Sequence, residues 1–156
     1  MPSSSDSPPS DPRELLHLDR QLCFLLYKAS GRMTQVYRPI LEPLGLTYPQ
    51  YLVMLALWQH GDQTVSALGQ QLDMEIGTLS PLLKRMEAAG HLERRRDKVD
   101  ERRVIVRLTP QGRNLRRSAL KAVPPALACQ LTMPLEELVE LHHGLSRLVE
   151  ALEPKA

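Results

Sequence analysis

The chain contains two cysteines, and the first lies in the apolar segment QLCFLLY at residues 21–27. A cysteine thiolate is a nucleophile that a peroxide can oxidise, whereas a buried cysteine is often only a small core residue. The residues beside Cys23 favour a reactive thiol, but they do not decide between a reactive cysteine and a core residue. The Tyr27 phenol, four residues on, can donate a hydrogen bond that favours the thiolate, and Arg20 adds a positive charge three residues earlier.

A second phenol shares the helix face of Cys23. At 100° per residue, Tyr27 and Tyr37 lie about 40° to either side of Cys23, at roughly 6 Å and roughly 21 Å along the axis. Tyr37 therefore cannot contact the thiol of its own chain. Two such helices crossing antiparallel at a dimer axis would bring it to the partner's thiol, so we hypothesise a sensor assembled by two chains. The flanking apolar side chains would admit an alkyl hydroperoxide better than hydrogen peroxide.

Length and composition indicate one soluble domain. The chain has 156 residues, of which 42% are hydrophobic and 24% are charged, as is ordinary for a globular protein. No apolar stretch reaches the roughly 20 residues of a membrane span, and residues 1–10 lack the features of a signal peptide. We expect a cytoplasmic protein without a membrane partner, whose cysteines are free thiols.

The net charge of +2 is unevenly distributed. Residues 94–117 contain ten Lys or Arg and three Asp or Glu, a net charge of +7, whereas residues 134–156 have a net charge of −3. A local concentration of positive charge favours a polyanionic partner. A basic run is also common on a merely solvated surface.

Hydrophobic periodicity and turn residues predict a mainly helical chain with one hairpin. After a disordered tail at 1–12, we expect helices at 15–37, 48–60, 65–73 and 78–89, a hairpin within 91–108, and helices from 110 and 135. The predicted helix N-caps are Thr47, Thr64 and Thr109, and the predicted stops are Gly61 and Gly90. The VPP segment at 123–125 is expected to interrupt the helix that starts near Thr109.

Two short helices followed by a hairpin are typical of a winged helix-turn-helix fold, in which the second helix enters the DNA major groove. In this helix Leu79, Leu83 and Met86 form an inward stripe, which leaves a polar outward face. Hydroxyl and basic side chains on such surfaces bind phosphates and base edges. The residues predicted to bind DNA are Thr78, Ser80, Lys84, Arg85, Arg94, Arg95, Arg96, Arg102 and Arg103. A helix pair with a solvated hairpin is the alternative.

The predicted fold class is therefore mainly α with a small β-hairpin wing. The winged helix-turn-helix region spans 47–112, between an N-terminal dimerisation and sensor region at 13–46 and C-terminal dimerisation helices at 113–156. The apolar stripes of the two terminal regions need cover, which a second subunit of a homodimer would supply. Packing of these helices on each other within one chain is the alternative.

Several segments resemble a known family. DERRVIVRLTPQG at 100–112 resembles the wing signature of MarR-type regulators, in which residues matching Asp100 and Arg102 shape the wing and place the arginine at DNA. LDRQLCFLLYKAS at 18–30, VYRPILEPLGLTYPQYLVMLALW at 36–58 and GTLSPLLKRMEAAG at 77–90 are similar, more narrowly, to the organic hydroperoxide resistance repressors (OhrR type). The resemblance covers about residues 18–112.

This resemblance implies a dimeric repressor that releases double-stranded operator DNA when an organic hydroperoxide oxidises its sensor cysteine, matched here by Cys23. In the two-cysteine branch of the family, a thiol matching Cys129 of the partner subunit then forms an intersubunit disulfide. Family tyrosines matching Tyr37 and Tyr48 hydrogen-bond the sensor sulfur, with Tyr27 nearby. The chain departs from the family where relatives often read LDSGTL, because MEIGTL places Ile76 where they have a hydroxyl.

Two other functions stay open from the sequence. A MarR-type repressor could instead bind a small phenolic ligand without covalent chemistry. A thiol peroxidase could use Cys23 and Cys129, but its basic hairpin would then have no purpose, so we do not expect an enzyme. We predict neither a cofactor nor a metal site, because His142 and His143 do not share a helix face and no ligand cluster accompanies them.

Overall fold

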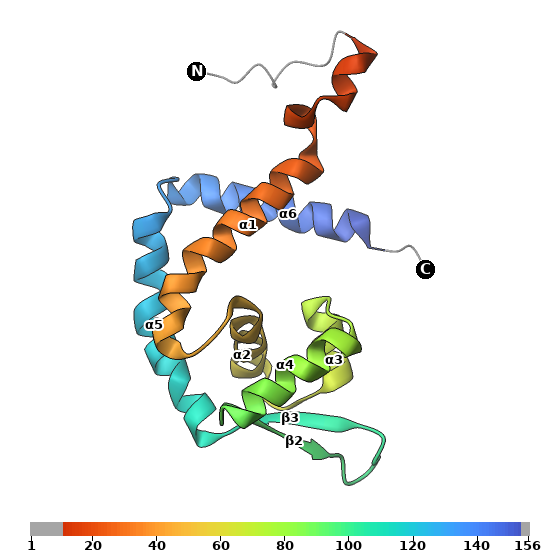
Figure 1. Ribbon diagram of the computed structural model, residues 1–156, viewed down its shortest axis with the longest axis vertical. Helices are drawn as coiled ribbons and strands as arrows, with labels where there is room; N and C mark the ends of the chain where they lie inside the picture. Colours follow the sequence, from red (N-terminus) through yellow and green to blue (C-terminus); the bar gives the residue numbers. More distant parts are fainter. Residues whose placement is uncertain (1–10, 154–156) are drawn as a thin grey trace.

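Figure 1 shows a computed structural model of the protein, which describes residues 11–153. The predicted tail at 1–12 lies outside the described residues except for its last two. The 3-10 helices η1 (Pro12–Leu16) and η2 (Leu18–Arg20) precede α1 (Leu22–Leu41), and η3 (Glu42–Leu44) follows it. The next elements are α2 (Tyr48–His60), β1 (Gln63–Thr64), α3 (Val65–Leu72) and α4 (Ile76–Ala88). The chain continues with β2 (Leu92–Arg96), β3 (Val104–Leu108), α5 (Pro110–Gln130) and α6 (Leu135–Leu152).

The small sheet has one strand more than the predicted hairpin. Its order is β1-β3-β2, and both pairings are antiparallel, with Gln63 and Arg94 opposite Val106 on its two sides. The two residues of β1 are too few to show a hydrophobic period. The helices and this sheet confirm the predicted class, mainly α with a β wing.

The predicted N-caps Thr47, Thr64 and Thr109 and the predicted glycine stops are confirmed. The Thr64 and Thr109 hydroxyls each accept a hydrogen bond from the backbone N–H three residues on, at 3.1 and 3.0 Å. The Thr47 N–H donates to the side chain of the residue three positions on, at 2.9 Å, as in a capping box. Gly61 and Gly90 have φ of 75° and 80°, a region that favours glycine.

The first long helix begins at Leu22 and not at residue 15 as predicted. The backbone of His17 and Gln21 is extended, with ψ of 135° and 112°, and separates η1, η2 and α1. The side-chain amide of Gln21 donates to the backbone carbonyls of Leu15 and His17 at 2.5 and 3.2 Å. This irregular start is therefore stabilised by local hydrogen bonds, and Leu15 remains 58% exposed.

The predicted interruption at VPP is wrong, because α5 continues through Pro124 and Pro125. A proline in a helix removes a backbone donor and crowds the preceding turn. The flanking residues offset this cost by packing: Ala119 and Val123 are buried, and Leu127 packs against the core. Both prolines are exposed, so their rings do not disturb that packing.

Within the described residues, the buried core lies between Leu41 and Val123. Met86, predicted on the inward stripe of its helix, is fully buried there with Met54, Leu57 and others. Burying such a side chain contributes about 1.5–3 kcal/mol. By contrast, α6 has no buried residue, and in Figure 1 it crosses α1 away from the winged-helix lobe. None of the described helices is both long and apolar enough to span a bilayer.

Candidate functional site

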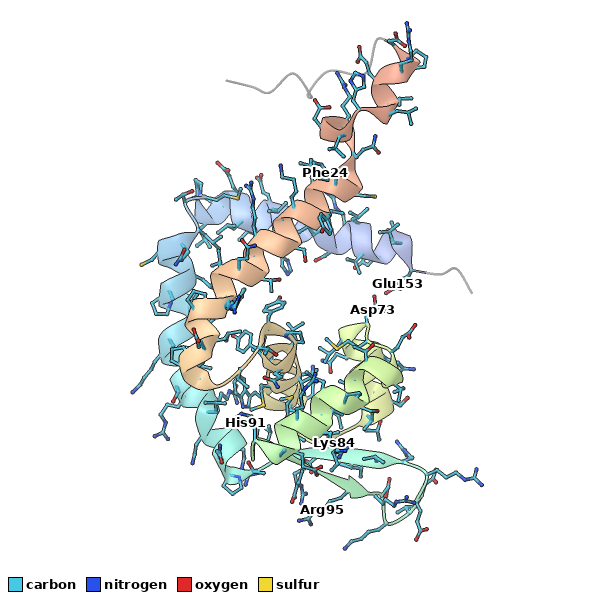
Figure 2. All side chains as sticks on the ribbon, viewed as in Figure 1. Phe24, Asp73, Lys84, His91, Arg95 and Glu153 are labelled. Carbon is cyan, nitrogen blue, oxygen red and sulfur yellow. The ribbon has the colours of Figure 1, made fainter. Side chains whose placement is uncertain are left out.

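Helix α4 presents the predicted polar face. Leu79, Leu83 and Met86 are completely buried, which turns the opposite face outward because residues three and four apart share one side of a helix. Thr78, Lys84 and Arg85 are exposed on that face, and Ser80 is half-buried. Figure 2 shows Lys84 and Arg95 at the end of the molecule opposite to Phe24. The helix is thus oriented as a recognition helix must be.

Asp100 shapes the tip of the β2–β3 hairpin, called the wing below. Its carboxylate accepts the backbone N–H of Arg102 at 3.1 Å, and its carbonyl accepts that of Arg103 at 2.9 Å. The turn leaves both arginine side chains exposed. They line a groove of about 650 Å³ between α3, α4 and the wing, together with Ser80 and Ile76.

Arg94 differs from the other predicted DNA-binding arginines because it faces helix α4. Its backbone N–H, Nε and Nη2 donate to the Glu87 carboxylate at 2.8, 3.0 and 2.8 Å. These bonds hold the pKa of Glu87 below its ordinary value. The sequence alone does not identify Glu87 as the partner of Arg94, because the two residues lie on different elements. Arg95 pairs with Glu93 along its own strand at 3.0 Å, and Arg96 is exposed.

Cys23 and Cys129 are both exposed free thiols. Cys23 lies in the second position of α1 and lines a shallow depression with Tyr27, Lys28 and Arg32. Arg20, the predicted positive neighbour, forms an ion pair with Glu14 at 3.1 Å. The depression therefore takes its positive charge from residues that the sequence argument did not name.

The structure brings Tyr37 and Tyr48 together, with ring centroids 4.8 Å apart. Burial raises the pKa of Tyr37, and the nearby phenols of Tyr51 and Tyr48 raise it further, so this phenol remains a donor at neutral pH. Cys23 and Tyr37 belong to one uninterrupted helix, which separates them by roughly 21 Å. One chain thus contains both parts of the predicted sensor without joining them.

Two aromatic residues extend this pair. Tyr51 lies 5.8 Å from Tyr37, and Trp58 lies 6.3 Å from Tyr51, both between ring centroids. This contact was not singled out from the sequence, although the spacing of Tyr48, Tyr51 and Trp58 places all three on one face of α2. Within residues 11–153, no three His, Cys, Asp or Glu side chains are grouped so as to hold a metal.

Comparisons with known proteins identify the family. The sequence profile of the transcriptional regulator SarA/Rot family matches residues 35–118. An organic hydroperoxide resistance transcriptional regulator of Bacillus subtilis (strain 168) is 43% identical over 140 residues, which cover 90% of this chain and 95% of the relative. The chain belongs to the MarR family of winged helix-turn-helix transcriptional regulators. This MarR-family chain is therefore a DNA-binding regulator and not an enzyme.

Solved structures agree with the assignment to the MarR family. Reduced AbfR bound to DNA has a TM-score of 0.76 at 33% identity, covering 91% of this chain and 99% of that one. Disulfide-formed AbfR has a TM-score of 0.63 at 35% identity, with coverages of 88% and 96%. Wild-type MarR from E. coli, in its apo form, has a TM-score of 0.69 at 25% identity, with coverages of 82% and 96%.

Proposed function

We propose that this MarR-family protein is a redox-sensing repressor that acts in the cytoplasm as a homodimer and releases operator DNA when an organic hydroperoxide oxidises Cys23. The separation of Cys23 from Tyr37 along one helix carries the proposal. Each chain holds a thiol at one end of α1 and a tyrosine pair at the other, so two antiparallel copies would complete two equivalent sites. The similarity to the hydroperoxide resistance regulator supports the same inducer.

The exposed apolar surfaces of α1 and α6 support a homodimer. Large apolar side chains on these helices are 37–76% exposed in the single chain: Leu22, Leu25, Met33, Leu135, Val139, Leu141, Leu145, Val149 and Leu152. Many exposed apolar side chains on two helices are typical of an interaction site in a soluble protein. Two-fold pairing would also present two recognition helices to two half-sites of an operator.

The oxidation step uses the thiolate of Cys23. Its sulfur attacks the terminal oxygen of the hydroperoxide, an S–O bond forms, and the O–O bond breaks. Two electrons pass from sulfur to the peroxide, and the leaving alkoxide takes up a proton to become an alcohol. The products are a sulfenic acid at Cys23 and the alcohol. Donation from the partner subunit's Tyr37 to the thiolate would favour its charged form.

Cys129 completes the proposed cycle as the resolving residue. Its thiol displaces oxygen from the sulfenic acid of the other subunit, so that an S–S bond forms and the oxygen leaves as water with the thiol proton. Cys129 is the second-last residue of α5, and it is exposed. Disulfide-formed AbfR, a protein of similar fold, supports a disulfide in this cycle.

The test uses an operator duplex selected by the reduced protein from a random-sequence pool. We expect stoichiometric cumene hydroperoxide to release wild type, whereas Cys23→Ser binds normally and stays bound. A non-reducing gel should show a covalent dimer of wild type and no such band for Cys129→Ser. Reduction with dithiothreitol should restore binding by wild type.

Release of Cys23→Ser by the hydroperoxide, as readily as wild type, would disprove the sensor role of Cys23. Release of the fully reduced protein by a phenol such as salicylate, without a response to hydroperoxide, would instead favour a non-covalent repressor. Persistence of the covalent dimer in Cys129→Ser would remove the resolving role from Cys129 and leave the role of Cys23 intact.

A further inference from the structure

Four aromatic rings form a continuous row from the proposed sensor into the winged-helix lobe. The row begins with Tyr48 and Tyr37 at 4.8 Å and continues through Tyr51 at 5.8 Å to Trp58 at 6.3 Å, all between ring centroids. Tyr51 is only 8% exposed. Rings at these separations are in direct contact, and a packed interior leaves little room for one ring to move alone.

The far end of the row is attached to the backbone of α5. Trp58 Nε1 donates a hydrogen bond to the Gly112 carbonyl at 2.9 Å, across 54 positions of the chain. Gly112 lies in the first turn of α5, where its N–H donates to the Thr109 cap at 3.0 Å. The indole therefore holds the point at which the wing ends and α5 begins.

Gly112 is also pressed against the segment that joins α4 to the wing. A Cβ at this glycine would lie 2.0 Å from the His91 carbonyl oxygen, so the two backbones are in contact without space between them. His91 directly precedes β2, and its N–H donates to the Met86 carbonyl of α4 at 3.0 Å. A displacement of Gly112 must therefore move the end of the recognition helix or the start of the wing.

We propose that Trp58 is the positioning residue that passes a displacement of Tyr37 and Tyr48 to the recognition helix and the wing. The proposal rests on the proposed function for its trigger, oxidation of the partner's Cys23 beside Tyr37. The row supplies the mechanical path: ring contacts as far as Trp58, one hydrogen bond to Gly112, and a backbone contact to His91. Packed elements of this kind switch between discrete arrangements and do not deform continuously.

Trp58→Phe tests the path, because it keeps an aromatic ring beside Tyr51 and removes only the indole donor. Gln63→Met is the matched control, since it removes a side-chain to backbone bond to Ala56 of the same helix outside the row. We expect Trp58→Phe to form the sulfenic acid at the wild-type rate, measured by dimedone labelling. Its ratio of oxidised to reduced operator Kd should be smaller than that of wild type by about fivefold, the effect of one lost hydrogen bond, whereas Gln63→Met should match wild type.

A double-mutant cycle tests the path without oxidation. Operator Kd is measured for reduced wild type, Tyr37→Leu, Trp58→Phe and the double variant. We expect the effect of Tyr37→Leu to shrink by at least about threefold in the Trp58→Phe background, because the moved ring no longer pulls on Gly112. Additive effects, or an unchanged oxidised-to-reduced ratio, would overturn the proposal. Failure of wild type to respond to hydroperoxide would refute the proposed function, while the cycle would still decide the path.

The fluorescence of Trp58 also gives a direct readout in variants that keep this residue, because it is the only tryptophan of the chain. We expect its emission to change in reduced Tyr37→Leu and to stay unchanged in Gln63→Met. This measurement keeps Trp58 itself, so it decides the proposal even where Trp58→Phe does not fold. An emission spectrum of Tyr37→Leu identical to that of wild type would show that the ring contacts do not transmit and would overturn the proposal.

Discussion

Arg94 and Arg102 are both wing arginines, yet the structure predicts opposite effects of replacing them. The Arg94 guanidinium makes two hydrogen bonds to the Glu87 carboxylate, at 3.0 and 2.8 Å, so its charge is already neutralised by the protein. Arg102 is exposed, and the wing turn presents its side chain to solvent. Arg94 is thus expected to fix the wing to α4, and Arg102 to neutralise a DNA phosphate.

The expected magnitudes follow from exposure. The Arg94 and Glu87 side chains are 29% and 35% exposed, so water screens the pair and Arg94→Gln should cost about 1 kcal/mol of unfolding free energy. For a chain of this size that lowers Tm by about 2–4 °C. Arg102→Gln should change stability by less than about 0.5 kcal/mol. It should lower the slope of log Kd against log salt concentration by about 0.9 per subunit, whereas Arg94→Gln leaves the slope unchanged.

The assay is operator binding by fluorescence anisotropy from 50 to 300 mM KCl, as about six salt concentrations per variant suffice to fit the slope. Thermal unfolding of the same preparations gives Tm. A slope that falls equally in both variants would refute the reasoning, since it would mean that Arg94 leaves Glu87 to contact DNA. An unchanged Tm for Arg94→Gln would show that the Glu87 contact does not hold the wing.

Three further predictions concern stability. The pKa of Glu87 is lowered in the folded state. The stability that its carboxylate contributes is therefore complete above the ordinary value of 4.5 and is lost as pH falls through the folded pKa. The difference in urea unfolding free energy between wild type and Glu87→Gln should accordingly vanish in acid. Burial lowers the pKa of His91, whose Nδ1 has no hydrogen-bond partner, so Tm should fall as pH drops below about 6.5, and less so in His91→Phe. Pro125→Ala should restore a backbone donor inside α5 and raise the unfolding free energy, by up to about 3 kcal/mol; a lower Tm would contradict this.

The sequence predicted those features that depend on a few neighbouring residues. Thr64 and Thr109 cap helices, and Gly90 ends one, because capping needs only a hydroxyl or a permissive backbone at the right position. The prediction at VPP failed for the complementary reason. A proline disfavours a helix locally, but Val123 is held by tertiary packing that the local pattern does not contain.

In the candidate site, too, some features follow from the local sequence and others depend on tertiary packing. The outward face of α4 and the shared face of Cys23 and Tyr37 follow from helical period alone. The partner of Arg94 does not, since Glu87 reaches it across a turn between a helix and a strand. The row through Tyr51 and Trp58 depends on how α1 packs on α2, and only its α2 half is visible as spacing in the sequence.

The buried core of the described residues extends from Leu41 to Val123, whereas Cys23 is exposed and α6 has no buried residue. In the proposed dimer, the complete sensor site forms only when two chains associate, so the fraction of complete sites depends on protein concentration. A newly made chain at low concentration would have a recognition helix but no partner Tyr37 beside Cys23, whose own-chain phenol is Tyr27 alone. Sensitivity to hydroperoxide would then rise with the concentration of the protein in the cell. At low concentration the repressor would respond poorly to hydroperoxide, because few chains would have a partner.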